Sequence, residues 1–292
     1  MKFYRIYIEL TNVCGLSCSF CPPKELASQQ MDLVFFESVI IEVKAYTKEI
    51  ACHVMGDPLT LNNLSEYLNI IHKHGLKALL TTSGYFLKKH SYDALFHPCV
   101  KQINLSLNSF NKNDTSLTFE QYLSPILSLC QAKLKRNEEI FINLRVWNLD
   151  NAMSEQLFNT MLFNKLSNTF DVNIDLDDIY KNKPKSIRLA SKILIHFDHY
   201  FEWPALSNKN YGDGTCQGLQ SHIAILASGK VLPCCLDGEG VIDLGNLHDN
   251  SLKEILVSTR ATNMIEGFNK SKAVEELCQK CSYKERFNIE AN

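Results

Sequence analysis

Residues 14–21 read Cys-Gly-Leu-Ser-Cys-Ser-Phe-Cys, which places three cysteines in the spacing C-x3-C-x2-C. They follow Tyr4–Leu10, an apolar run rich in aromatic and β-branched residues that predicts a strand. Three thiolates on one short loop can hold three irons of a 4Fe–4S cluster and leave the fourth iron open. A closed structural site would use four ligands. The loop therefore predicts an iron that can bind a cofactor, and the alternative is a zinc ion with a fourth ligand from elsewhere.

Strand-like and helix-like segments alternate after this loop. With Tyr4–Leu10, the expected strands are Ile50–Met55, Lys77–Thr82, Gln102–Leu107, Glu139–Trp147 and Val172–Leu176. The expected helices between them are Leu33–Tyr46, Leu61–His74, Tyr85–Leu95, Phe119–Lys135 and Ala152–Leu166. Such βα units build a parallel sheet, and a complete barrel has eight of them. About six units predict an α/β fold with a partial (β/α)6 TIM-like barrel, whose ligands bind at the carboxyl ends of the strands.

Composition narrows the class of protein. The chain has 292 residues and a net charge of −2, so no bulk attraction to nucleic acid or anionic membranes is expected. No stretch is apolar for long enough to cross a bilayer, and the start of the chain does not resemble a signal peptide. A cytoplasmic protein is expected. Its eleven cysteines therefore indicate metal binding rather than disulfides, because the cytosol keeps thiols reduced.

The pattern changes after about residue 177. A helix is expected over Ser186–His199, and Trp203-Pro204 lies where it can line a substrate channel. His222–Ala227 and Val231–Pro233 flank Ser228-Gly229-Lys230 and predict a β-hairpin. Five cysteines follow from Cys216 onward, including the chelate Cys278-Gln-Lys-Cys281. Three others, at positions 52, 99 and 130, are expected in the core.

The first cysteine loop resembles that of the radical S-adenosylmethionine (SAM) superfamily, whose motif has this spacing and an aromatic residue where Phe20 stands. The resemblance implies that Cys14, Cys18 and Cys21 hold a 4Fe–4S cluster, whose open iron binds SAM. Reduction of the cluster would cleave SAM to a 5′-deoxyadenosyl radical, which abstracts hydrogen from the substrate.

Further segments resemble that superfamily in order. Met55-Gly56-Asp57-Pro58 stands where the family carries Gly-Gly-Glu-Pro, with Met and Asp replacing the first Gly and the Glu. Ser83 lies in a turn that resembles the family's Thr-Asn-Gly. The resemblance also implies SAM contacts at Ser106 and Asn108, and an ion pair between Arg145 and the SAM carboxylate.

The C-terminal cysteines resemble the SPASM and twitch extensions of radical SAM enzymes, which hold auxiliary 4Fe–4S clusters. Five cysteines suit one such cluster, the twitch arrangement, and the ligand set implied is Cys216, Cys234, Cys278 and Cys281. A structural zinc on the same residues is the alternative. Cys235 is then a buried spare, a replacement for Cys234, or a hydrogen-atom donor. We expect a radical SAM core over residues 1–177, a connecting segment over 178–215 that can line the substrate site, and an auxiliary-cluster domain over 216–292.

The expected protein is a radical SAM oxidoreductase or modifying enzyme that takes electrons from a donor such as flavodoxin or ferredoxin. Its expected substrate is a peptide or protein side chain. The alternative substrate is a small molecule of amino sugar or nucleoside type, favoured by the absence of a visible leader-binding domain before the first strand. A non-catalytic Fe–S or zinc sensor is the alternative of another class. Asp175, Asp177 and Asp178 can bind a polar substrate, act as a base, or cap a helix.

Overall fold

A single curved sheet of ten strands organises the protein, which the computed structural model describes over residues 1–23, 25–147 and 155–287. The strands are β1 (Arg5–Ile8), β2 (Glu49–Ala51), β3 (Lys77–Thr82), β4 (Val100–Ser106), β5 (Phe141–Val146), β6 (Ser186–Ala190), β7 (Ile193–Phe197), β8 (His222–Ile225), β9 (Lys230–Leu232) and β10 (Gly245–Asn246).

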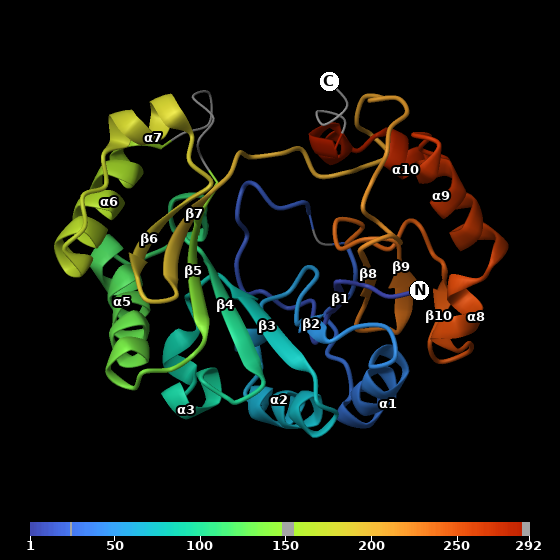
Figure 1. Cartoon of the computed structure of the whole chain (residues 1–292), viewed down its shortest axis with the longest axis horizontal. Helices are drawn as coiled ribbons and strands as arrows, with labels where there is room; N and C mark the ends of the chain where they lie inside the picture. The colour runs from blue at the N-terminus through green and yellow to red at the C-terminus, as the bar shows by residue number, and fades with distance from the viewer. Residues whose placement is uncertain (24, 148–154, 288–292) are drawn as a thin grey trace.

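Helices surround this sheet on its outer side (Figure 1). The α-helices are α1 (Leu33–Val43), α2 (Leu64–Lys73), α3 (Tyr92–Leu95), α4 (Asn108–Asn111), α5 (Phe119–Lys135), α6 (Gln156–Phe170), α7 (Leu176–Asn182), α8 (Leu252–Leu256), α9 (Thr259–Asn269) and α10 (Glu276–Gln279). Short 3-10 helices are η1 (Pro58–Thr60), η2 (Leu87–Lys89) and η3 (Ser282–Phe287). None of the helices in the described ranges is long and apolar enough to cross a lipid bilayer.

The strand order confirms the partial barrel. The sheet runs β10-β9-β8-β1-β2-β3-β4-β5-β7-β6, and the six strands from β1 to β7 in this order are parallel. The C-terminal hairpin of β8 and β9 is present as predicted, and β8 joins the free edge of β1 in parallel. The extension is thus continuous with the barrel sheet, so the two cysteine sets are carried on one framework.

Two predictions for the middle of the chain are wrong. The expected helix Ser186–His199 is the antiparallel hairpin of β6 and β7, and the sixth parallel strand is β7 rather than Val172–Leu176. In β7, buried residues alternate with less buried ones, which is the period of a strand. The buried residues are Ile193, Ile195 and Phe197. Asp175 caps α7 by accepting the backbone N–H groups of Asp177 and Asp178. Of the helix expected over Ala152–Leu166, residues 152–154 lie outside the described residues.

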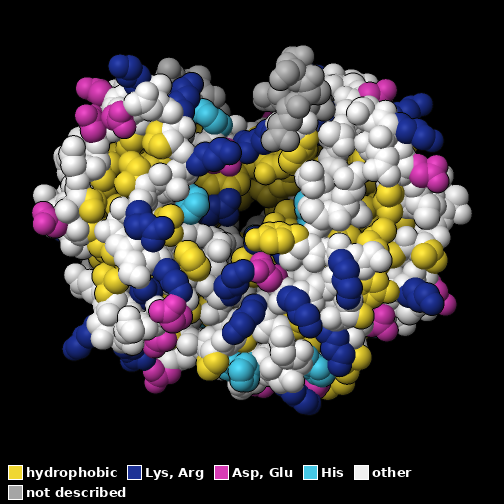
Figure 2. Space-filling model, in the orientation of Figure 1, with side chains coloured by type: hydrophobic (Ala, Val, Ile, Leu, Met, Phe, Trp, Pro, Cys, Tyr) yellow, Lys and Arg dark blue, Asp and Glu magenta, His cyan; other side chains and the backbone are white. Residues whose placement is uncertain are grey.

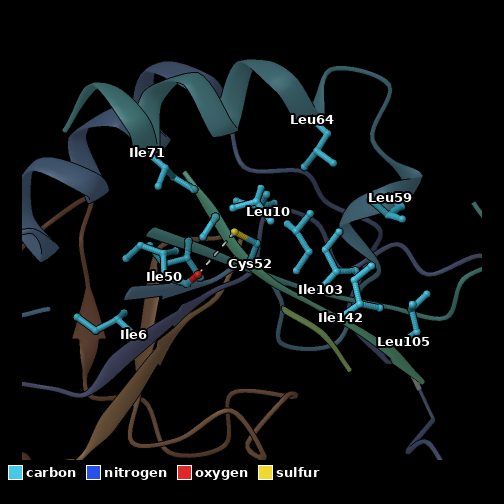
Figure 3. Packing of buried hydrophobic residues seen from close by; sticks show 14 of the residues in the cluster. Ile6, Leu10, Ile50, Cys52, Leu59, Leu64, Ile71, Ile103, Leu105 and Ile142 are labelled. Atoms are coloured by element: carbon cyan, nitrogen blue, oxygen red, sulfur yellow. Dashed lines mark hydrogen bonds between the residues drawn. The ribbon is translucent and has the colours of Figure 1, made fainter. Parts of the chain in front are cut away.

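The hydrophobic core fills the space between the strands and the helices. Leu64 and Ile71 of α2 pack toward strand residues such as Ile50 and Ile103 (Figure 3). The remaining cysteines behave as expected, since Cys52, Cys99 and Cys130 are all buried in this cluster. Many apolar residues of the barrel strands therefore point outward, toward the helices.

The inner face of the barrel is polar instead. Asn104 of β4 donates to Thr81 of β3 and accepts from Asn143 of β5, with both N···O distances 3.1 Å. The three residues are register neighbours, so they form one polar row across three strands. Typical barrels fill this space with branched aliphatic side chains. Here it is a hollow, seen at the centre of Figure 2.

Candidate active site

One cavity of about 330 Å³ contains nearly all of the predicted site. Both cysteine sets line it, and so do the predicted cofactor contacts apart from Pro58. These lining residues are Cys14, Cys18, Phe20, Cys21, Met55, Gly56, Asp57, Ser83, Ser106, Asn108, Arg145, Cys216, Cys234, Cys278 and Cys281. Trp203 and Pro204 also line it, as the sequence predicted. Pro58 lies behind this wall, buried in η1.

The first cysteine loop lies against the turn after β4. Cys18 Sγ approaches the carbonyl oxygen of Ser109 at 4.0 Å, and the backbone N–H of Ser19 donates to Lys112 at 2.8 Å. Cys14 and Cys18 are partly buried, whereas Cys21 is exposed. The loop therefore presents its thiols to the cavity from a backbone that neighbouring elements hold in place.

Gly56 holds the same loop from the other side. A Cβ atom at this position would lie 1.9 Å from the carbonyl oxygen of Thr11, so only glycine fits. The next residue, Asp57, donates its backbone N–H to Val13 at 3.0 Å, and the Thr60 hydroxyl donates to the same carbonyl at 3.3 Å. The segment after β2 is thus packed directly on the residues that precede Cys14.

The Asp57 side chain is bonded within the protein. Its Oδ2 accepts from the Thr82 hydroxyl at 2.9 Å and from both the backbone N–H and the hydroxyl of Ser83 at 2.8 Å. Its Oδ1 accepts the backbone N–H of Leu59 at 3.0 Å. Burial raises the pKa of Asp57, and the bonds from Ser83, Leu59 and Thr82 partly offset this. Because four donors face the carboxyl group, its surroundings fit the ionised form, which ties the β2 turn to the end of β3.

Asn108 shapes the opposite wall of the cavity. Its Oδ1 accepts the backbone N–H of Trp147 at 2.7 Å, so the amide fixes the end of β5. Ser106 accepts the hydroxyl of Ser109 on its carbonyl oxygen at 2.6 Å. The side chain of Asn108 thus orients another lining residue.

Arg145 is the cation of this wall. Its guanidinium lies 4.5 Å from the ring centre of Trp147. Within residues 1–23, 25–147 and 155–287 it has no ion pair and no hydrogen bond. Burial lowers the pKa of Arg145, and the nearby Tyr7 and Asp198 oppose this. Arg145 is only partly buried and lines the cavity, and a cation there with no partner among the described residues suits an anionic group of a bound molecule.

The second cysteine set comes together across long sequence distances. Burial raises the pKa of Cys234 well above its usual value, and the neighbouring thiols of Cys216, Cys235 and Cys278 add to this. Cys278 in turn interacts with Cys216 and Cys281. Four partly buried thiols from a loop, a hairpin end and a C-x2-C chelate therefore lie close together along the cavity, with Cys234 among them.

Cys235 faces a different neighbourhood from Cys234. Burial raises the pKa of Cys235 to about 11, and its side chain interacts with the Tyr7 hydroxyl. Arg145 and Arg5 are its charged neighbours. The structure thus separates the two adjacent cysteines, one toward the other thiols and one toward the interior of the barrel.

Sequence reasoning missed the floor of the cavity. Tyr7 packs edge to face against His53 at 5.5 Å and against His222 at 5.7 Å, and all three residues line the cavity. Burial, Arg145 and Arg5 lower the pKa of His53 to about 3, so its ring is neutral, and its Nδ1 is buried without a partner in the described ranges. The alternation of Tyr7 with two buried isoleucines in β1 was the available signal.

The two cysteine sets suit iron–sulfur clusters. A 4Fe–4S cluster spreads its cysteine ligands over separate irons, and thiolates are the ligands that such clusters use. Both sets line the same cavity. The fold and site together are an open barrel whose central cavity carries two sets of cysteines.

Comparison with known proteins gives the family. The sequence model of the radical SAM superfamily matches residues 8–146, and that of the SPASM iron–sulfur cluster-binding domain matches residues 216–282. The chain belongs to the radical SAM superfamily and carries a SPASM-type domain. Its cofactors are accordingly SAM, a 4Fe–4S cluster and additional Fe–S binding in the C-terminal domain.

Individual relatives are distant. A GTP 3′,8-cyclase of Synechocystis is 28% identical over 148 residues, which is 49% of this chain and 45% of that enzyme. The chain thus matches less than half of that relative. Among solved structures, BtrN in complex with AdoMet and 2-DOIA has a TM-score of 0.55 at 15% identity, covering 97% of this chain and 94% of that one. Streptococcus suis SuiB bound to S-adenosylmethionine has a TM-score of 0.62 at 15% identity, covering 98% and 74%. These likenesses support the fold.

Proposed function

We propose that the protein reductively cleaves SAM and abstracts a hydrogen atom from a peptide or protein side chain. The observation that carries this proposal is the single cavity that both cysteine sets line. In this proposal, a SAM-binding cluster, a substrate and an electron-accepting cluster share that cavity. Such confinement keeps a reactive radical away from water and side reactions.

Each cysteine set is assigned to one cluster in this proposal. Cys14, Cys18 and Cys21 hold the first cluster, and Cys216, Cys234, Cys278 and Cys281 hold the second. When bound, the first cluster supplies the electron that cleaves SAM, SAM supplies the radical that takes the hydrogen atom, and the second cluster accepts one electron. The protein supplies orientation and electrostatics.

The chain's own residues position SAM in this proposal. Arg145 pairs with the SAM carboxylate, because its guanidinium lines the cavity and has no partner within the described ranges. The backbone of Met55 and Gly56 faces the amino group, held there by Asp57. Ser83 and Ser106 complete the polar contacts at the strand ends. Asn108 acts through Trp147, whose position it fixes.

Aromatic side chains that contact one another line the cavity. Phe201 contacts Trp147 at 5.6 Å, Trp203 at 5.3 Å and Tyr283 at 5.1 Å between ring centres. Phe20 of the first cysteine loop contacts Tyr200 at 5.8 Å. The segment between β7 and the C-terminal domain is therefore the proposed substrate-lining wall, and its rings exclude water from the reaction.

Similar structures illustrate both substrate classes. SuiB has been solved bound to the precursor peptide SuiA, and this supports a peptide substrate here by analogy of fold. A small polar molecule is the second candidate, and the floor formed by Tyr7, His53 and His222 favours it. Neutral imidazoles beside a phenol on the cavity wall suit hydroxyl or amine groups on a substrate that enters the barrel completely.

The remaining assignments follow from the class of reaction. We propose flavodoxin or ferredoxin as the electron donor and the cytoplasm as the site of action. No membrane partner and no nucleic acid enters the proposal, since the net charge is only −2 and no described helix is suited to a bilayer.

The deciding experiment uses anaerobically reconstituted protein. Iron and sulfide are counted, dithionite and SAM are added, and 5′-deoxyadenosine is measured. We expect about eight irons per chain and 5′-deoxyadenosine that Cys18→Ala abolishes. Tightly bound zinc without 5′-deoxyadenosine would overturn the proposal and make this a metal-stabilised sensor or binding protein.

A matched pair of variants tests the second cluster. Cys234→Ala should remove about four irons per chain while SAM cleavage at the first cluster is at least partly retained. Cys235→Ala should retain all the iron, because Cys235 faces Tyr7 rather than the other thiols. Equal iron loss in both variants, or in neither, would contradict the ligand assignment.

A further inference from the structure

Lys284 is a buried lysine beside the second cysteine set. It lies in η3 and is only 2% exposed. Its ammonium donates to the carbonyl oxygens of Cys278 at 3.0 Å, Gln279 at 3.1 Å and Cys281 at 3.0 Å. These carbonyls belong to the end of α10 and to the C-x2-C chelate. The ammonium therefore closes the chelate loop from the protein side.

The Lys284 ammonium lacks an anionic partner in the described parts of the chain. No carboxylate lies within ion-pair distance of it there. Lys280, in the same loop, instead pairs with Glu276 at 2.9 Å. Burying an ammonium costs several kcal/mol unless an opposite charge compensates. Three carbonyl groups satisfy the donors of Lys284 but leave its full charge unbalanced.

The groups that can supply the missing negative charge are the cysteines themselves. The Lys284 ammonium lies 3.0 Å from the carbonyl oxygens of Cys278 and Cys281, the two cysteines of the C-x2-C chelate. Lys284 also lines the cavity with these residues. Thiolates that ligate an iron–sulfur cluster carry the negative charge that this buried ammonium faces.

We propose that Lys284 is the fixed counter-ion of the second cluster and raises its reduction potential. The proposal rests on the proposed function, which assigns that cluster to Cys216, Cys234, Cys278 and Cys281. Reduction adds one electron and therefore one negative charge to the cluster. A buried cation nearby stabilises that charge in a medium of low dielectric constant, so the reduced form is favoured. Lys284 thus suits the cluster to accept an electron from the cavity.

The test isolates the second cluster. In a Cys14→Ala/Cys18→Ala/Cys21→Ala background, the full chain is reconstituted anaerobically, its iron is counted, and the potential is measured by redox titration followed by electron paramagnetic resonance. Lys284→Met removes the charge and the donors. Lys284→Gln removes the charge but keeps an N–H donor, and Lys284→Arg keeps both. Lys280→Met is the matched control, because its ammonium is already paired.

We expect about four irons per chain and a more negative potential in Lys284→Met and Lys284→Gln. Lys284→Arg should stay near the parent value, and Lys280→Met should shift much less. Unchanged potentials in the neutral variants with full iron would overturn the inference. If both neutral variants lose the cluster, its retention in Lys284→Arg supports the inference and its loss there overturns it. A parent protein without iron would instead refute the second cluster of the proposed function.

Discussion

Replacing Asp57 by asparagine tests how the β2 turn is held. The substitution keeps the shape of the side chain but turns one of its two acceptor oxygens into a donor. Each oxygen of Asp57 accepts a backbone N–H, one from Leu59 and one from Ser83. The Thr82 and Ser83 hydroxyls can rotate to accept from an amide, but a backbone N–H cannot. Either orientation of the introduced amide therefore leaves one buried N–H facing an NH2 group.

The expected cost follows from that count. A buried donor left without an acceptor costs about 1–3 kcal/mol, and a hydrogen bond to a charged acceptor is worth about 1.5–3 kcal/mol. We expect Asp57→Asn to lower the free energy of unfolding by about 2–4 kcal/mol. The β2 turn packs on the residues before Cys14, so SAM cleavage should fall as well.

Asp32→Asn is the matched control. Asp32 caps α1 through a single oxygen, Oδ1, which accepts from Val34 at 2.8 Å and from Phe35 at 3.2 Å. Asparagine serves equally well as an N-cap, so the cost should stay below about 0.5 kcal/mol. Urea unfolding of the metal-free, reduced protein, followed by circular dichroism, measures both variants. Equal unfolding free energies for the two variants would refute the reasoning.

Three further changes test other parts of the site. Gly56→Ala should displace the first cysteine loop and abolish cluster assembly, because the new Cβ would meet the backbone of Thr11. Gly75→Ala is the control: it has open space around it, so it should cost only about 1 kcal/mol of unfolding free energy and keep its iron. Intact iron in Gly56→Ala would contradict this. Arg145→Met should weaken SAM binding about 10- to 100-fold in equilibrium dialysis, because about 1.5–3 kcal/mol of charge-assisted hydrogen bonding is lost. An unchanged affinity for SAM would exclude Arg145 from the SAM site. The pKa of His53 is lowered to about 3, so the unfolded chain binds a proton at this residue more readily than the folded chain does. The free energy of unfolding should therefore fall as pH drops below about 6.5, by up to about 1.4 kcal/mol per pH unit. His53→Phe should reduce that slope.

Local patterns were sufficient for the first cysteine loop and for most of the barrel. The three cysteines of residues 14–21 are close in the chain, so their spacing alone brings the thiols to one loop. The alternation of strands and helices up to β5 predicted a parallel sheet, with β3 and α5 found at their predicted bounds. Polar residues at the carboxyl ends of those strands had to meet at one edge, and the cavity contains them.

The hairpin of β6 and β7 was missed for a physical reason. Residues 186–199 mix apolar and polar positions that suit a helix about as well as two short strands. Lys192 has a positive φ of 55° in the turn between the two strands, and a lysine in the sequence does not predict that conformation. The free edge of β5, which β7 covers, decided the outcome, because an unpaired edge strand favours a partner strand.

The sequence by itself determined the family, the first cysteine loop and the cysteine-rich C-terminal extension, because these depend on residue type and short spacing. Only the tertiary structure decided which side chains surround them. Tyr7 of β1 meets His53, which follows β2, and His222 of β8, and Lys284 meets the second cysteine set without a carboxylate partner in the described part of the chain. Such neighbours are far apart along the chain, and the curvature of one sheet around a polar interior brings them together.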